Sequence, residues 1–156
     1  MIRSELRTWV EINKNAAKAN VKTFRRLIGP KIFMWAVVKS KAYGHGLFTF
    51  PSLVMNDVDG FCVDTLIEGI KLREMGIQKP ILVLGFTLPK LFPLAKERGI
   101  TISISSHDIL RHFISAKNVP NFHLKVDTGM HRQGVYPEDL PAIIKALKSA
   151  DKNQSM

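Results

Sequence analysis

The chain has one cysteine, no long apolar run and few acidic residues, and each of these shortages excludes a class of site or of protein. Cys62 alone cannot form an internal disulfide or a multi-cysteine zinc site, and its apolar neighbours predict a small buried core residue. No apolar run approaches the roughly 20 residues that cross a bilayer. The first seven residues lack the apolar centre of a signal peptide. We therefore expect a cytoplasmic protein without a membrane segment.

The shortage of acidic residues leaves a strongly basic chain: 13 Asp and Glu stand against 23 Lys and Arg, for a net charge of +10. Nucleic-acid binding would concentrate basic residues in an arm, a stripe or a recognised motif. Here the basic residues are spread over successive helix-like segments, at 25–26, 71–73, 96–98 and 145–148. We interpret them as solvated outer faces whose positive field attracts anionic ligands, and we expect no nucleic-acid partner.

Short apolar runs alternate with amphipathic stretches, which predicts β/α units around a parallel sheet. A first short strand is expected at 8–12, and then a helix from Asn13 or Asn15 to Ile28 with an apolar face that includes Phe24 and Leu27. The later predicted strands are 33–38, 60–63, 81–84, 100–104 and 122–126. The later predicted helices are 46–56, 65–75, 89–98, one capped by Ser106, and one from 137 or 138 to 149.

The number of these units sets the fold class. We predict an α/β fold, an incomplete (β/α)8 TIM-type barrel of about five β/α units preceded by a short strand. A complete eight-unit barrel typically needs about 250 residues. Five units alone cannot close it, so an open parallel edge would expose unpaired backbone groups.

The segment 39–46, KSKAYGHG, follows the apolar run 33–38. Lys39 therefore falls at the carboxyl end of a buried strand, where α/β barrels keep their chemistry. In a partly dry pocket a lysine amine becomes nucleophilic toward an aldehyde, and the hydroxyl of Tyr43 could reach a phosphate. Taken alone, a lysine after a strand is more often simply solvated.

A second polar segment, HLKVDTGMHR at 123–132, follows the last predicted strand and presents Arg132 in a glycine-containing loop. The planar guanidinium of an arginine suits bidentate recognition of a carboxylate. Lys125, taken alone, is an ion-pairing lysine with Asp127 as its candidate partner. His45 and His131 are interpreted as loop residues, and no paired arrangement of His, Cys or Asp specifies a metal.

Both segments resemble motifs of the bacterial alanine racemases. AVVK at 36–39 with AYGHG at 42–46 resembles the cofactor-lysine motif of that family, and KVDTGM at 125–130 resembles a second motif, with an arginine two residues after its methionine. The likeness continues through 6–12, 60–63, 68–77 and 81–85. Lys41 stands where that family usually has an acidic or amide residue, and Gln133 where it usually has an apolar one. The resemblance implies that residues 1–156 are the N-terminal portion of a barrel domain, without the family's β-rich C-terminal domain.

The resemblance also implies an activity, the interconversion of L- and D-alanine for peptidoglycan precursors through a pyridoxal 5′-phosphate (PLP) Schiff base on Lys39. It implies that Lys39 is also the catalytic acid/base and that Tyr43 contacts the cofactor phosphate. Arg132 would bind the substrate carboxylate and contact the cofactor, and Lys125 would be a lysine that can be carbamylated. Full-length members form homodimers in which a tyrosine of the partner's C-terminal domain is the opposite-face base. Since racemisation needs bases on both faces, we expect little activity from this chain alone.

Two other hypotheses stay open on the sequence. A non-catalytic PLP-binding homeostasis protein, of the related single-domain barrel class, would keep the Schiff-base lysine and need no partner tyrosine. A structural fragment would bind no cofactor until further segments complement it.

Overall fold

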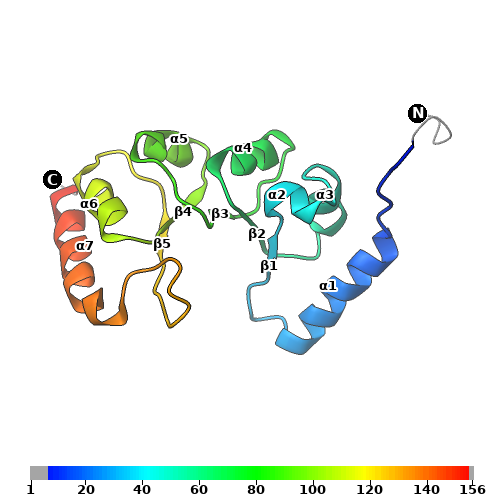
Figure 1. Cartoon of the computed structure of the whole chain (residues 1–156), viewed down its shortest axis with the longest axis horizontal. Coiled ribbons are helices and arrows are strands. Elements are labelled where there is room, and N and C mark those ends of the chain that lie inside the picture. Colours follow the sequence, from blue (N-terminus) through cyan, green and yellow to red (C-terminus); the bar gives the residue numbers. More distant parts are fainter. Residues whose placement is uncertain (1–6, 155–156) are drawn as a thin grey trace.

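The computed structural model describes residues 7–154, which contain a five-stranded parallel sheet with its strands in chain order (Figure 1). The strands are β1 (Trp35–Val37), β2 (Gly60–Val63), β3 (Ile81–Val83), β4 (Thr101–Ile104) and β5 (Phe122–Leu124). Each pairs in parallel with the next one along the chain. The predicted parallel arrangement of five β/α units is therefore confirmed.

Helices connect the strands, and α3, α4, α5 and α6 lie along one side of the sheet (Figure 1). The helices are α1 (Lys14–Ile28), α3 (Thr49–Val54), α4 (Leu66–Glu74), α5 (Phe92–Glu97), α6 (His107–Ser115) and α7 (Leu140–Gln154). Short 3-10 turns, Pro89–Leu91 and Pro137–Asp139, precede α5 and α7. Three helices begin at side chains that accept a backbone N–H, as expected for N-caps: Asn13, Thr65 and Ser106. Within residues 7–154, no helix is both long and apolar enough to cross a membrane.

The outward face of the sheet forms the hydrophobic core with the helices. Side chains alternate between the two faces of a strand. Those on the outward face of β2, β3 and β4 have no exposed surface: Phe61, Val63, Ile81, Val83, Ile102 and Ile104. Helix residues of the same cluster cover them, including Leu66 and Leu72 of α4 and Phe92 of α5. Burial of this apolar surface is the main term that stabilises the sheet.

The inward face of the sheet is concave, and side chains of its first and last strands meet across it. The ring centroids of Trp35 on β1 and His123 on β5 lie 6.4 Å apart, with the ring planes at 77°. In a flat sheet, four strand spacings would separate these strands by about 19 Å. The contact therefore requires the curvature of a barrel wall. Cys62 on this face is buried as predicted, and burial raises the pKa of its thiol to about 11.

Three expectations need correction. Residues 8–12 form no strand, because a strand needs a neighbouring strand to accept its hydrogen bonds and no described segment pairs there. The helix expected at 46–56 spans only Thr49–Val54, and Gly46, where it was expected to begin, has a φ of 93°, which is outside the helical region. The apolar face of α1 is only partly covered: Val21 packs against the core, but Phe24 is 60% exposed and Leu27 is 77% exposed.

Candidate active site

Lys39 lies at the carboxyl end of β1, as the sequence predicts. Val38 extends the pairing of this strand, with its N–H donating to the carbonyl of Cys62 at 2.8 Å, and its side chain is fully buried. The strand therefore ends on an anchored residue, and Lys39 is the first residue beyond it. Its side chain is 34% exposed, so the amine is partly shielded from solvent without being enclosed.

The segment after Lys39 is a left-handed turn, labelled α2 in Figure 1 (Lys39–Tyr43). Four consecutive residues without glycine have φ between 53° and 56°: Ser40, Lys41, Ala42 and Tyr43. Each such residue costs about 1 kcal/mol or more in backbone strain, and strain of this kind clusters at functional sites. Hydrogen bonds from Ala42 N–H to Val38 O (2.9 Å) and from Gly46 N–H to Lys41 O (2.7 Å) hold the turn. The residue types of this segment did not predict this run.

Two carboxylates reach the Lys39 segment, one from Asp64 in the turn between β2 and α4 and one from Glu68 in the first turn of α4, and neither was predicted from the sequence. Asp64 Oδ1 accepts a hydrogen bond from Lys39 Nζ at 3.0 Å. Glu68 Oε1 accepts one from the backbone N–H of Ser40 at 2.7 Å. The Thr65-x-x-Glu68 spacing of a capping box was visible in the sequence, but the long-range contact to Ser40 was not.

The loop after β5 is organised around the buried carboxylate of Asp127. Its Oδ1 accepts hydrogen bonds from the backbone N–H groups of Gly129 and His131, both at 3.0 Å. These two bonds hold the pKa of the Asp127 carboxyl below its usual value, since they favour the charged form. The same loop returns to the sheet through a parallel bridge between Val126 and Val135. The loop that carries Arg132 is therefore fixed at both ends.

Lys125 and Arg132 occupy this second loop region, but they are placed differently from each other. Lys125 Nζ donates to Gln133 Oε1 at 3.4 Å, so the expected ion pair between Lys125 and Asp127 is wrong. The Asp127 carboxylate instead satisfies backbone donors of its own loop. Arg132 is exposed and lines a hollow of about 330 Å³, formed by the segments that follow β3, β4 and β5.

The structure brings the two predicted motifs to one edge of the sheet without placing their side chains in contact. Lys39 follows β1 and Arg132 follows β5, and the carboxyl ends of all five parallel strands lie on this edge. Lys39 is not among the residues that line the hollow with Arg132. Tyr43, the last residue of the left-handed turn, is 62% exposed. The three groups therefore share an edge that remains open.

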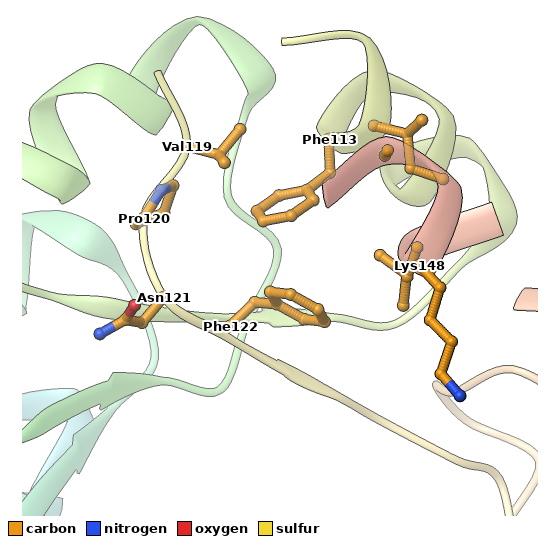
Figure 2. Close-up of a pocket in the computed structure, with 9 residues that line it drawn as sticks. Phe113, Val119, Pro120, Asn121, Phe122 and Lys148 are labelled. Atoms are coloured by element: carbon orange, nitrogen blue, oxygen red, sulfur yellow. The ribbon is translucent and has the colours of Figure 1, made fainter. Parts of the chain in front are cut away.

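A larger hollow of about 540 Å³ lies elsewhere, between α6, α7 and the segment that enters β5 (Figure 2). Phe113 and Phe122 face it, and Lys148 contributes an amine at its rim (Figure 2). It lies at the amino end of β5, whereas Lys39 and Arg132 follow the carboxyl ends of their strands. None of the motif residues lines it, so it is not part of the candidate site.

The side chains at the open edge have chemistry that suits an aldehyde, a phosphate and a carboxylate. The partly shielded amine of Lys39 suits the aldehyde. The phenol of Tyr43 suits the phosphate, and the guanidinium of Arg132 suits the carboxylate. The net charge of +10 also favours an anionic ligand. Within residues 7–154, no group of three or more His, Cys, Asp or Glu side chains is arranged to hold a metal ion.

Known proteins match the chain over most of its length. Residues 12–155 match the family described as "Alanine racemase, N-terminal domain". The alanine racemase of Streptococcus uberis is 40% identical over 134 residues, which are 82% of this chain and 36% of that protein. The serine/alanine racemase of Enterococcus gallinarum is 41% identical over 128 residues, 81% of this chain and 18% of that protein. A solved alanine racemase of Clostridium difficile 630 superposes with a TM-score of 0.83 at 32% identity, covering 92% of this chain and 40% of that one. The chain thus spans two fifths or less of these relatives.

Proposed function

Because the chain belongs to the alanine racemase N-terminal domain family, we propose that it supplies the lysine-bearing part of a PLP-dependent alanine racemase. The observation that carries this proposal is the position of Lys39. It follows β1 at the sheet edge that also carries the Arg132 loop, and a strained left-handed turn holds the segment in place. Strand-end residues of this edge are the ones that perform catalysis in barrel enzymes.

Each residue has a role that its chemistry allows. PLP, when bound, supplies an aldehyde that condenses with an amine and a conjugated ring that accepts the electrons left at the substrate α-carbon. Lys39 holds the cofactor and, once released, moves a proton on one face of that carbon. The hydroxyl of Tyr43 binds the phosphate, and the guanidinium of Arg132 pairs with the substrate carboxylate. Lys125 contacts Gln133, the neighbour of Arg132, and carbamylation of Lys125 would add a negative charge beside that loop.

The opposite face of the substrate needs a second base, and we propose that it comes from outside these 156 residues. The active form is then a homodimer that includes this second base and interconverts L- and D-alanine in the cytoplasm, for peptidoglycan precursors. A single base cannot remove and redeliver a proton on opposite faces efficiently. Purified chain with PLP is therefore expected to show little interconversion of the two enantiomers. Robust turnover would contradict this assignment of the second base.

Visible absorbance of the chain mixed with PLP tests the cofactor role. We expect a band of protein-bound PLP that disappears in Lys39→Ala and persists in Lys22→Ala. Lys22 is the control because it is an exposed lysine of α1 that has no part in the proposed site. A chain without a bound-PLP band, or a band that survives Lys39→Ala, would overturn the proposal.

A complementation experiment distinguishes catalysis from cofactor binding alone, because it adds the portion of a relative that has no counterpart in these 156 residues. The C-terminal portion of the Streptococcus uberis racemase would be mixed with the chain and PLP, and the conversion of L-alanine to D-alanine measured. A gain that requires Lys39 supports the racemase. PLP binding without any gain would favour the non-catalytic PLP-binding protein.

A further inference from the structure

Glu68 lies in the first turn of α4, and its carboxylate accepts three backbone hydrogen bonds. Oε2 takes the N–H groups of Asp64 at 2.9 Å and Thr65 at 3.2 Å, and Oε1 takes the N–H of Ser40 at 2.7 Å. Glu68 itself is partly buried between the ends of β1 and β2. One side chain thus ties together the turns that follow two neighbouring strands.

The contact to Ser40 is not needed to cap the helix. A capping box consists of the Thr65 hydroxyl accepting the N–H of Glu68, here at 3.3 Å, and the Glu68 carboxylate accepting the N–H of Thr65. Oε2 completes this box alone. Oε1 is left for Ser40, which lies 28 residues earlier in the chain and directly after Lys39.

Ser40 is also the first residue of the left-handed run, so the bond from its N–H joins the start of that run to α4. Strained backbone persists only when surrounding contacts hold it. On the other side, the Glu68 carboxylate fixes the backbone of Asp64, whose side chain bonds the Lys39 amine at 3.0 Å. Glu68 therefore holds both the backbone next to Lys39 and the residue that contacts its amine.

We propose that Glu68 is a positioning residue for Lys39, which aligns the lysine for reaction with PLP by anchoring Ser40 and Asp64. This inference rests on the proposed function. Glu68 does not touch the cofactor in this account and acts only through the placement of the lysine. Loss of its reach to Ser40 should leave the helix cap in place and displace the amine.

Glu68→Asp tests this, because aspartate keeps the negative charge at the start of α4 but is one methylene shorter. Thr65→Ala is the matched control, since it removes the other half of the capping box and leaves the Ser40 contact. The 156-residue chain and both variants would be treated with PLP and borohydride, and the pyridoxyl group on Lys39 compared with that on the exposed Lys14 and Lys22 of α1. Hydrogen exchange of the Ser40 amide would be measured on the same proteins without PLP.

In Glu68→Asp, the labelling ratio of Lys39 to the α1 lysines should fall about tenfold, and the Ser40 amide should lose protection. Thr65→Ala should change neither, although it costs about 1 kcal/mol of helix stability. Unchanged labelling or protection in Glu68→Asp overturns the positioning role while the proposed function stands. Equal losses in Thr65→Ala overturn it too, because the effect would then belong to the helix cap. A wild-type chain that labels Lys39 no more than Lys14 or Lys22 contradicts the proposed function itself, and the positioning role with it.

Discussion

Gly134 packs directly against the backbone of Asp127, where the Arg132 loop returns to the sheet. A Cβ at position 134 would lie 2.4 Å from the backbone nitrogen of Asp127 and 2.7 Å from the carbonyl carbon of Val126. The same segment is joined by hydrogen bonds from Asp127 N–H to Val135 O and from Gly134 N–H to Ser105 O, at 2.9 and 3.0 Å. Closure of the loop therefore depends on the absence of a side chain at position 134.

Gly134→Ala should be much more destabilising than Gly129→Ala, which is its matched control. Both glycines have positive φ, 134° and 124°, but the added methyl group meets nothing within 4 Å at position 129. The backbone conformation alone costs about 1–2 kcal/mol at either site, and the clash adds roughly 2 kcal/mol or more at 134. Denaturant unfolding of both variants measures the difference. Equal losses would show that the loop is not closed in this way.

Acid stability should depend on Asp127. Its pKa in the folded protein is lowered from 3.8, first by the hydrogen bond from Gly129 N–H and then by the one from His131 N–H. A carboxyl with a lowered folded-state pKa contributes stability that is present above about pH 4 and is lost as the pH falls through the lowered value. Asp127→Asn should therefore flatten the decline in the free energy of unfolding below pH 4. An unchanged acid slope would count against these bonds.

Asp59 provides an independent check of the same effect at the other end of the sheet. Its carboxylate is paired with the Arg25 guanidinium and accepts the Met34 N–H at 2.7 Å, and both contacts lower its pKa, the Arg25 contact most. Asp59→Asn should also flatten the acid slope, and the two variants combined should have nearly additive effects because the sites share no partner. Strong non-additivity would indicate that acid unfolding is not carried by these separate contacts.

Arg73 should resist replacement by lysine. Its guanidinium donates to four backbone carbonyls, those of Ile77, Lys79, Arg98 and Gly99, at 2.7 to 3.0 Å, and burial lowers its pKa. Lysine keeps the charge but not the planar array of donors, so Arg73→Lys should cost about 2–3 kcal/mol. Arg111→Lys is the control, since the Arg111 side chain is 76% exposed and pairs with Asp108 at the surface. Thermal unfolding should separate the two variants clearly.

The sequence was sufficient for the elements whose signals are local. The apolar runs located all five strands of the sheet, and the caps at Asn13, Thr65 and Ser106 located the starts of three helices. The prediction of a strand at 8–12 was wrong because alternating apolar and polar residues show only that a segment could pair. Pairing also needs a neighbouring strand. The prediction of a buried apolar face on α1 failed for a related reason: amphipathicity indicates which face of a helix can be buried but not which element covers it.

For the site, sequence motifs located Lys39 and Arg132 but not the contacts that hold them. The ion pair with Asp64 and the bond from Ser40 to Glu68 join residues 25 and 28 positions apart, so they follow from strand order rather than from local pattern. The left-handed run was also unpredictable, since Ser40, Lys41 and Ala42 have no preference for positive φ. Asp127 belongs to the second motif, KVDTGM at 125–130, but its role as hydrogen-bond acceptor for its own loop appears only in the structure.

The most direct test of the account is the identity of the lysine that binds PLP. The full chain would be incubated with PLP, reduced with borohydride and digested, and the pyridoxyl group located by mass spectrometry. The account predicts that Lys39 carries most of the label, well above Lys41, an exposed lysine two residues away in the same turn. Label spread evenly over exposed lysines, or placed mainly on Lys41, would contradict the assignment of Lys39 as the cofactor lysine.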